Sequence, residues 1–225
     1  MSEQTNLAEM QDLGFDTVPT VVVDGRAFQA FPDEVLKREL GIPIESNSLE
    51  IALKHLETSA QILAITADVV AALPQSLWSV RLVDNRDRGL GQWSWHIFQF
   101  AVECVEGIEG GVLEWEDVRR LAERQYWTDE ETYLEFESIA RYGKAVVERL
   151  SHWSRSVDDD LLSQEMESPW GILSGYGLIS HLERHSAIHL RQIVDFVKAR
   201  VPAYEAFPPV EFMETIPSYG SLKQD

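Results

Sequence analysis

Apolar residues recur every three or four positions along most of the chain after residue 46, and this spacing places them on one face of an α-helix. Four long segments show the pattern. Four apolar stripes of this kind are buried most simply in a four-helix bundle. We expect helices from Asn47 or Ser48 to Leu73, from just after Gly91 to about Glu106, from Thr128 to about Trp153, and from near Ser174 to just before Pro202.

Capping and stop signals set the boundaries of these helices. Pro74 follows the first segment, glycines between 107 and 111 end the second, and Thr128 opens the third with the capping-box sequence Thr-Asp-Glu-Glu. The connections after the second and third helices are longer than hairpin loops, which allows crossovers, and a short helix is expected over 116–124. We expect the tail after Pro202, which contains three further prolines, to be an extended wrap.

The first 45 residues follow a different pattern. A β-branched run over 17–23 predicts a strand, and Asp24-Gly25 is a hairpin turn signal from which 26–28 can return as a second strand. A short helix is expected over 33–40, and the unit is too small to bury a core of its own. The sequence therefore predicts a mainly α fold with a small hairpin–helix appendage at 1–45 and a four-helix bundle with a proline-containing tail over 46–225.

Composition narrows the class of protein. The chain has 225 residues, with 19 basic and 38 acidic side chains and a net charge of −19. A surface this acidic repels phosphate backbones, so we expect no nucleic-acid partner, and no apolar run is long enough to span a membrane. The lone Cys104 cannot form an internal disulfide, and Met1–Met10 lacks the basic and apolar regions of a signal peptide. Both features predict a reducing, cytoplasmic location.

Three of the six histidines, His181, His185 and His189, recur every four residues on the last long predicted helix. A four-residue step turns a helix by about 400°, so successive rings drift by only about 40° and share a face. Leucine, isoleucine and phenylalanine side chains lie within about 60° of His185, so we expect His185 and His189 to point inward, with His181 nearer the edge of that face. The expected outer face carries charged residues: Glu183, Arg184, Arg191, Asp195 and Lys198.

Two inward imidazoles one turn apart can converge on a divalent metal, and a third ligand must come from a facing helix. His96 is the candidate, because it shares the inner face of its helix with Trp93 and Phe100. Three histidines leave at least one coordination position open for water or substrate, as in catalytic sites. The alternative is that these histidines are hydrogen-bonded core residues that bind no metal. We expect Cys104 to be a buried, inert thiol and His55 to lie at the surface.

The arrangement resembles the DinB/YfiT-like superfamily. His96 lies near the start of one helix, and His185-x-x-x-His189 is followed by Leu-Arg-Gln-Ile at 190–193, where that family has R-G-Q after its H-x-x-x-H. The glycine of that motif is missing here. The resemblance covers roughly 47–201. It implies a bundle with crossed connections, a divalent metal such as zinc or nickel held by the three histidines, and a homodimer.

The resemblance also implies a class of reaction. Several members of the family use a low-molecular-weight thiol as transferases or isomerases, so we expect an enzyme that acts on a small electrophile, with the metal stabilising the thiolate. Glu103, on the same face as His96, and His181 are the candidates for proton transfer. The competing interpretation is a non-catalytic metal-binding or interaction module.

The N-terminal segment resembles the second half of a glutaredoxin or thioredoxin-like domain. Thr17-Val18-Pro19 looks like the segment that holds the cis-proline of that fold, followed by its hairpin and last helix. Residues 1–45 contain no cysteine, which excludes dithiol redox chemistry by this segment.

Overall fold

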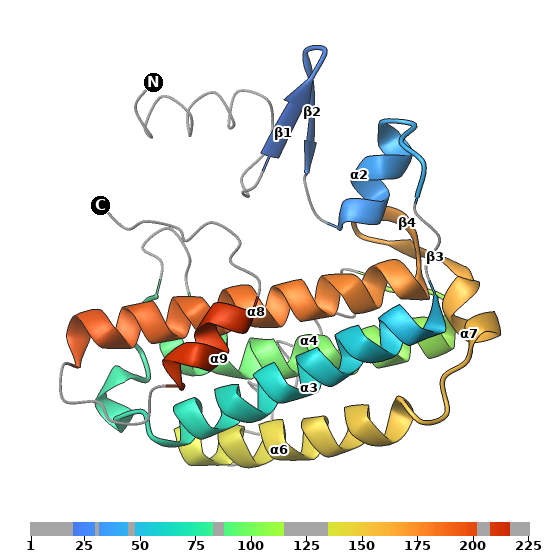
Figure 1. The fold of residues 1–225 in the computed structure, drawn as a ribbon. Helices are drawn as coiled ribbons and strands as arrows, with labels where there is room; N and C mark the ends of the chain where they lie inside the picture. The colour runs from blue at the N-terminus through green and yellow to red at the C-terminus, as the bar shows by residue number, and fades with distance from the viewer. Residues whose placement is uncertain are drawn as a thin grey trace.

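Four long helices form the body of the protein in the computed structural model, which describes residues 20–29, 32–44, 48–82, 88–114, 135–201 and 208–216. The predicted mainly α fold is confirmed (Figure 1). The four helices are α3 (Leu49–Ala71), α4 (Leu90–Gly110), α6 (Phe136–Trp153) and α8 (Gly175–Arg200).

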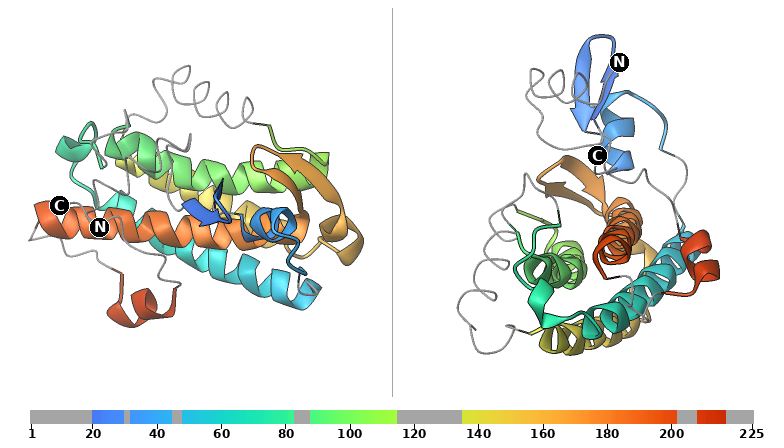
Figure 2. Two further views of the ribbon diagram at one scale, coloured as in Figure 1. Left: turned by 90° about the horizontal axis from the view of Figure 1, so that it is seen from above. Right: turned by 90° about the vertical axis from the view of Figure 1, so that its left-hand side faces the viewer.

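The bundle has an unusual order of neighbours. Helices α3 and α8 run in one direction and α4 and α6 in the other (Figure 1). Both α3 and α4 pack against α6 and α8, so the consecutive helices α3 and α4 occupy opposite corners of the bundle (Figure 2). Because α4 and α6 are parallel neighbours, no hairpin loop can join them, and the chain must cross over between them, as the sequence predicted.

The helix boundaries follow local chemistry. The Ser48 hydroxyl accepts a hydrogen bond from the Ile51 amide at 3.3 Å and caps α3. Helix α4 continues through Gly107 to Gly110, beyond its expected end at Glu106. The C-cap residue is Gly111, whose φ of 72° suits glycine. Helix α6 begins at Phe136 because Glu135 is extended, so one continuous helix from Thr128 to Trp153 was a wrong expectation. Thr128 itself and the expected helix over 116–124 lie outside the described residues.

The N-terminal hairpin and helix form at the predicted positions, although 17–19, the segment compared with a cis-proline loop, lies outside the described residues. Strands β1 (Thr20–Val23) and β2 (Arg26–Gln29) pair antiparallel, and Asp24 and Gly25 both have positive φ, as a tight hairpin turn requires. Helix α2 (Asp33–Glu39) follows.

The connection from α6 to α8 and the C-terminal tail contain elements that the sequence analysis missed. Helix α7 (Asp159–Ser163) leads into a hairpin of β3 (Glu165–Ser168) and β4 (Gly171–Ser174). The tail was expected to be extended, but Val210–Thr215 forms helix α9. Pro209 is its N-cap residue. A short 3₁₀ turn, η1 (Gln75–Leu77), follows α3.

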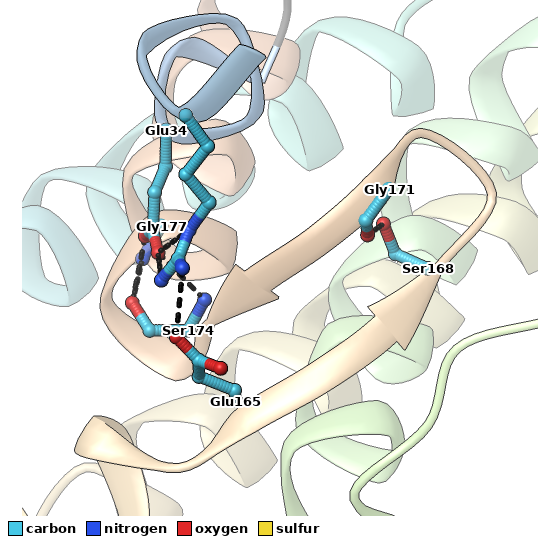
Figure 3. Close-up of polar contacts among 7 residues, drawn as sticks. Glu34, Glu165, Ser168, Gly171, Ser174 and Gly177 are labelled. Atoms are coloured by element: carbon cyan, nitrogen blue, oxygen red, sulfur yellow. Dashed lines mark hydrogen bonds and ion pairs between the residues drawn. The ribbon is translucent and has the colours of Figure 1, made fainter. Parts of the chain in front are cut away.

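A buried glutamate, Glu34, joins α2 to the start of α8 (Figure 3). The buried Glu34 carboxylate accepts hydrogen bonds from the Ser174 amide at 3.0 Å and from the Ser174 hydroxyl at 2.7 Å. Arg38 binds Glu34 at 2.8 Å and Glu165 of β3 at 2.7 Å. A Cβ atom at Gly177 would overlap the Glu34 carboxylate, so only glycine admits this close approach. The carboxylate thus lies at the amide-rich, positive end of α8.

The core is aromatic and aliphatic, with Trp95, Phe98 and Phe136 fully buried between the helices. On α3 the buried side of the helix includes Leu56, Leu63 and Val70 together with Ile62, whereas Leu53, near the start of the helix, is 36% exposed. Over the described residues, no helix combines the length and the apolar character needed to cross a membrane.

Candidate metal centre

Three histidines from two helices come together inside the bundle. His96 lies on α4, and His185 and His189 lie on α8; one ring nitrogen of each is within 4.8 Å of the others. The Nε2 atoms of His96 and His185 are 3.2 Å apart. Nitrogen ligands about 2.1 Å from one metal are separated by about 2.9–3.4 Å, so this pair already has the spacing of two ligands. We call these three residues the histidine triad.

The rings of the triad are half-buried and meet edge to face. The ring centroids of His185 and His189 are 4.3 Å apart, and those of His96 lie 5.0 Å from His185 and 5.6 Å from His189. Helical periodicity therefore identified the face on which these rings lie, and the packing of α4 against α8 brings the two faces together.

Gln192 sets the protonation of one triad histidine. Its Oε1 atom lies 2.6 Å from Nδ1 of His189, and a carboxamide oxygen can only accept, so Nδ1 donates. The Nε2 atom of His189 is then left with its lone pair for a metal. The sequence analysis assigned no role to Gln192, although its position three residues after His189, on the same face, was a usable signal.

Aromatic side chains wall the triad. The Trp93 ring lies 5.1 Å from His189, and the Phe100 ring lies 4.0 Å from His185. Burial lowers the pKa of His185 well below 6.5, and the neighbouring His189 and His96 lower it further. The ring is therefore neutral at physiological pH, which is the form that binds metals.

His181 lies beside the triad but is not part of it. Its ring centroid is 6.3 Å from that of His185 and 4.9 Å from that of Trp170. Burial, aided by the Arg184 charge, lowers the pKa of His181 to about 3, so the ring is neutral and a weak base. Its Nδ1 atom is buried and has no hydrogen-bond partner among the residues that the structure describes.

Glu103, the other candidate for proton transfer, is 2% exposed on α4. It follows His96 by seven residues, about 10 Å along the helix. Within the described part of the chain no carboxylate joins the three histidines in one metal-binding group. Burial and the Glu103 charge both raise the pKa of the neighbouring Cys104 thiol, which is 1% exposed and so suits an inert core residue.

The expected outer face of α8 is exposed at Asp195 and Lys198 but half-buried at Glu183, Arg184 and Arg191, which corrects the sequence analysis at these three positions. Glu183 accepts from Nδ1 of His55 at 2.5 Å and joins α8 to α3, so His55 is a bridging residue rather than a free surface one. Arg184 pairs with Asp33 of α2. The Arg191 guanidinium donates to the backbone carbonyls of Met213 and Ile216, around the end of α9. Charged residues on this face therefore attach other segments of the chain to α8.

Comparison with solved structures finds a similar fold. YfiT from Bacillus subtilis, described as a probable metal-dependent hydrolase with an unusual four-helix bundle topology, matches with a TM-score of 0.54 and 13% sequence identity. The match covers 70% of this chain and 91% of YfiT. This chain therefore shares the four-helix-bundle fold of YfiT, which is the fold that the sequence resemblance implied.

The other comparisons add no match. No protein-family model matches the chain, and comparison with curated proteins finds no relative. The resemblance of the N-terminal segment to a thioredoxin-like domain gains no support from any of the three comparisons.

Proposed function

We propose that the protein is a metal-dependent enzyme, with His96, His185 and His189 as the ligands of a divalent metal and hydrolysis of a small molecule as its reaction. The observation that carries the proposal is the convergence of three ring nitrogens from two helices within 4.8 Å. The description of YfiT as a probable metal-dependent hydrolase supports the choice of reaction. A divalent metal held by three imidazoles supplies an acidified water molecule as nucleophile.

The residues around the triad suit this role. Gln192 holds the His189 ring in the tautomer that leaves Nε2 free. Trp93 and Phe100 limit the access of water to the rings, and burial keeps His185 neutral. The triad offers three protein ligands, which matches catalytic rather than closed structural sites, since the latter use four. The donor set of three imidazoles suits zinc or nickel.

Thiol transfer is the alternative reaction that the family resemblance implied. It would use the same triad, with a thiol sulfur instead of water at the open position. The substrate in either case is a small molecule, and a homodimer in a reducing compartment remains our prediction for the assembly. A non-catalytic module would hold the metal without an exchangeable position.

Metal content and ligand exchange test the proposal. Protein purified after growth with zinc, nickel or manganese is measured for metal per chain, together with His189→Ala and with His152→Ala as a control that removes an exposed histidine of α6. We expect one metal per chain in the parent and in H152A and none in H189A, because two ligands bind far more weakly than three. Equal metal in H189A and the parent, or none in either, would falsify the ligand assignment.

Cobalt substitution then separates the reactions. The visible spectrum of the cobalt-loaded protein should change with pH as bound water ionises, and hydrolysis of an activated ester should follow the same transition. A charge-transfer band on addition of a thiol, with thiol transfer and no hydrolysis, would replace the hydrolase proposal by the transferase. A spectrum insensitive to both would assign the metal a structural role.

A further inference from the structure

A pocket of about 110 Å³ lies between α2 and the start of α8, outside the histidine triad. Asp33, Glu34 and Lys37 line it from α2. From α8 it is lined by Tyr176, Gly177, Ser180, His181 and Arg184. Only the docking of α2 on α8 creates this pocket, so no motif in the sequence predicted it.

Both carboxylates on the wall of the pocket are already neutralised. Asp33 accepts from the Arg184 guanidinium at 3.0 Å. Glu34 is held by Arg38 and by the backbone and hydroxyl groups of Ser174. Neither carboxylate therefore needs a cation from a ligand.

Lys37 is the exception to this pairing. It is half-buried, and its ammonium group has no ion pair or hydrogen bond with any residue that the structure describes. By contrast, the half-buried Arg184 and Arg191 bind a carboxylate and backbone carbonyls. In a chain with twice as many acidic as basic side chains, a half-buried cation without an anion is unusual. The positive charge of Lys37 at the wall of the pocket, unpaired among the described residues, therefore favours an anionic ligand.

Two further polar groups of the pocket are uncommitted. Among the described residues, neither the buried Nδ1 atom of His181 nor the Ser180 hydroxyl has a hydrogen-bond partner. A buried polar atom without a partner costs free energy that a ligand atom can recover. The pocket thus offers one cation, one hydroxyl and one neutral imidazole.

We propose that this pocket binds a small carboxylate, with Lys37 as its counter-charge and Ser180 and His181 as hydrogen-bonding groups. Because Asp33 is paired with Arg184 and Glu34 with Arg38, Lys37 gives the pocket one uncompensated positive charge. One such charge matches a monoanion better than a phosphate dianion. The centroid of the His181 ring is 6.3 Å from that of His185. A carboxylate bound to His181 would therefore be separated from the triad by the His181 ring. The binding of a carboxylate here does not depend on the proposed function. Only the further step, that the carboxylate is part of the substrate, rests on the proposed function.

Titration of metal-free protein with propionate tests the site. The full-length chain, labelled with ¹³C-histidine and kept in EDTA at constant ionic strength, is followed through the His181 ring signal, which the variant His181→Gln identifies. We expect the His181 signal to shift and to saturate with propionate. Lys37→Met should lower the affinity for propionate about tenfold or more, and Lys37→Arg should retain nearly all of it. Lys54→Met, which removes an exposed lysine of α3, is the matched control and should bind like the parent.

The result can overturn the proposal in three ways. The His181 signal can fail to saturate, K37M can bind propionate as tightly as K54M, or inorganic phosphate can bind more tightly than propionate. Because the experiment excludes metal, its outcome is independent of whether the triad proves to be a metal centre.

Discussion

The proton on each ring of the triad decides whether the three histidines can hold a metal together. Gln192 accepts from Nδ1 of His189, and outer hydrogen bonds of this kind fix the tautomer of metal-binding histidines. Gln192→Leu should therefore weaken metal affinity about 10–100-fold while the bundle stays folded. Gln61→Leu, at an exposed position of α3, is the control. Competition with a chelator measures both affinities, and equal values would remove Gln192 from the site.

Two histidines of α8 with lowered pKa values predict how stability depends on pH. Burial lowers the pKa of His181 from 6.5 to about 3, and that of His185 falls well below 6.5. Below about pH 6.5 these rings take up protons in the unfolded chain but remain neutral in the folded protein. The free energy of unfolding of metal-free protein should therefore fall as the pH drops below about 6.5.

The size of this effect is measurable for one ring. Between pH 5 and 6 each such ring contributes about 1 kcal/mol per pH unit to the slope. His181→Gln should reduce the slope by this amount in urea unfolding experiments with EDTA. A slope identical to that of the parent would mean that the folded His181 takes up its proton in this range.

The Glu34 carboxylate and Gly177 lie together at the contact between α2 and the first turn of α8. Glu34→Ala should lower the free energy of unfolding by about 2–3 kcal/mol, because Ser174 and Arg38 lose their acceptor. Glu39→Ala, which removes an exposed glutamate of α2, should cost less than about 1 kcal/mol. Gly177→Ala should also be destabilising, by about 1–3 kcal/mol, because its Cβ would overlap Glu34.

A double-mutant cycle tests whether these two residues act on each other. With Glu34 replaced by alanine the overlap is largely removed, so G177A should cost much less in the E34A background than in the parent. Additive costs in urea unfolding would mean that Glu34 does not occupy the first turn of α8 in solution.

The elements that the sequence predicted are those with strong local signals. The four long helices have sustained apolar periodicity, and the Asp24-Gly25 turn defines the first hairpin. The β3–β4 hairpin has only four residues per strand and depends on cross-strand pairs such as Met166 with Leu173, so its sequence alone carries little information. The same limit applies to α9, whose end is held by Arg191 from a distant part of the chain.

For the molecule as a whole, apolar periodicity predicted which residues share a helix face, but not which segments of the chain pack against that face. It placed His96, His185 and His189 on inner faces, and a bundle brings inner faces together. It also placed Glu183 and Arg184 on an outer face, which was wrong because α3 and α2 cover that face. A helix with charged residues on one side can be solvent-exposed or can bind polar partners, and only the tertiary structure distinguishes the two.

The triad joins two helices that are far apart in the chain, since His96 and His185 are separated by 89 positions. A metal bound by the folded triad, and only weakly by the unfolded chain, must therefore stabilise the whole bundle. At a free metal concentration about 100 times the dissociation constant, the gain is about 2.7 kcal/mol. Thermal unfolding with zinc or nickel and with EDTA should show a higher midpoint with metal for the parent and for His152→Ala. His96→Ala should lose the difference, because the remaining two ligands lie on α8 alone and no longer connect it to α4.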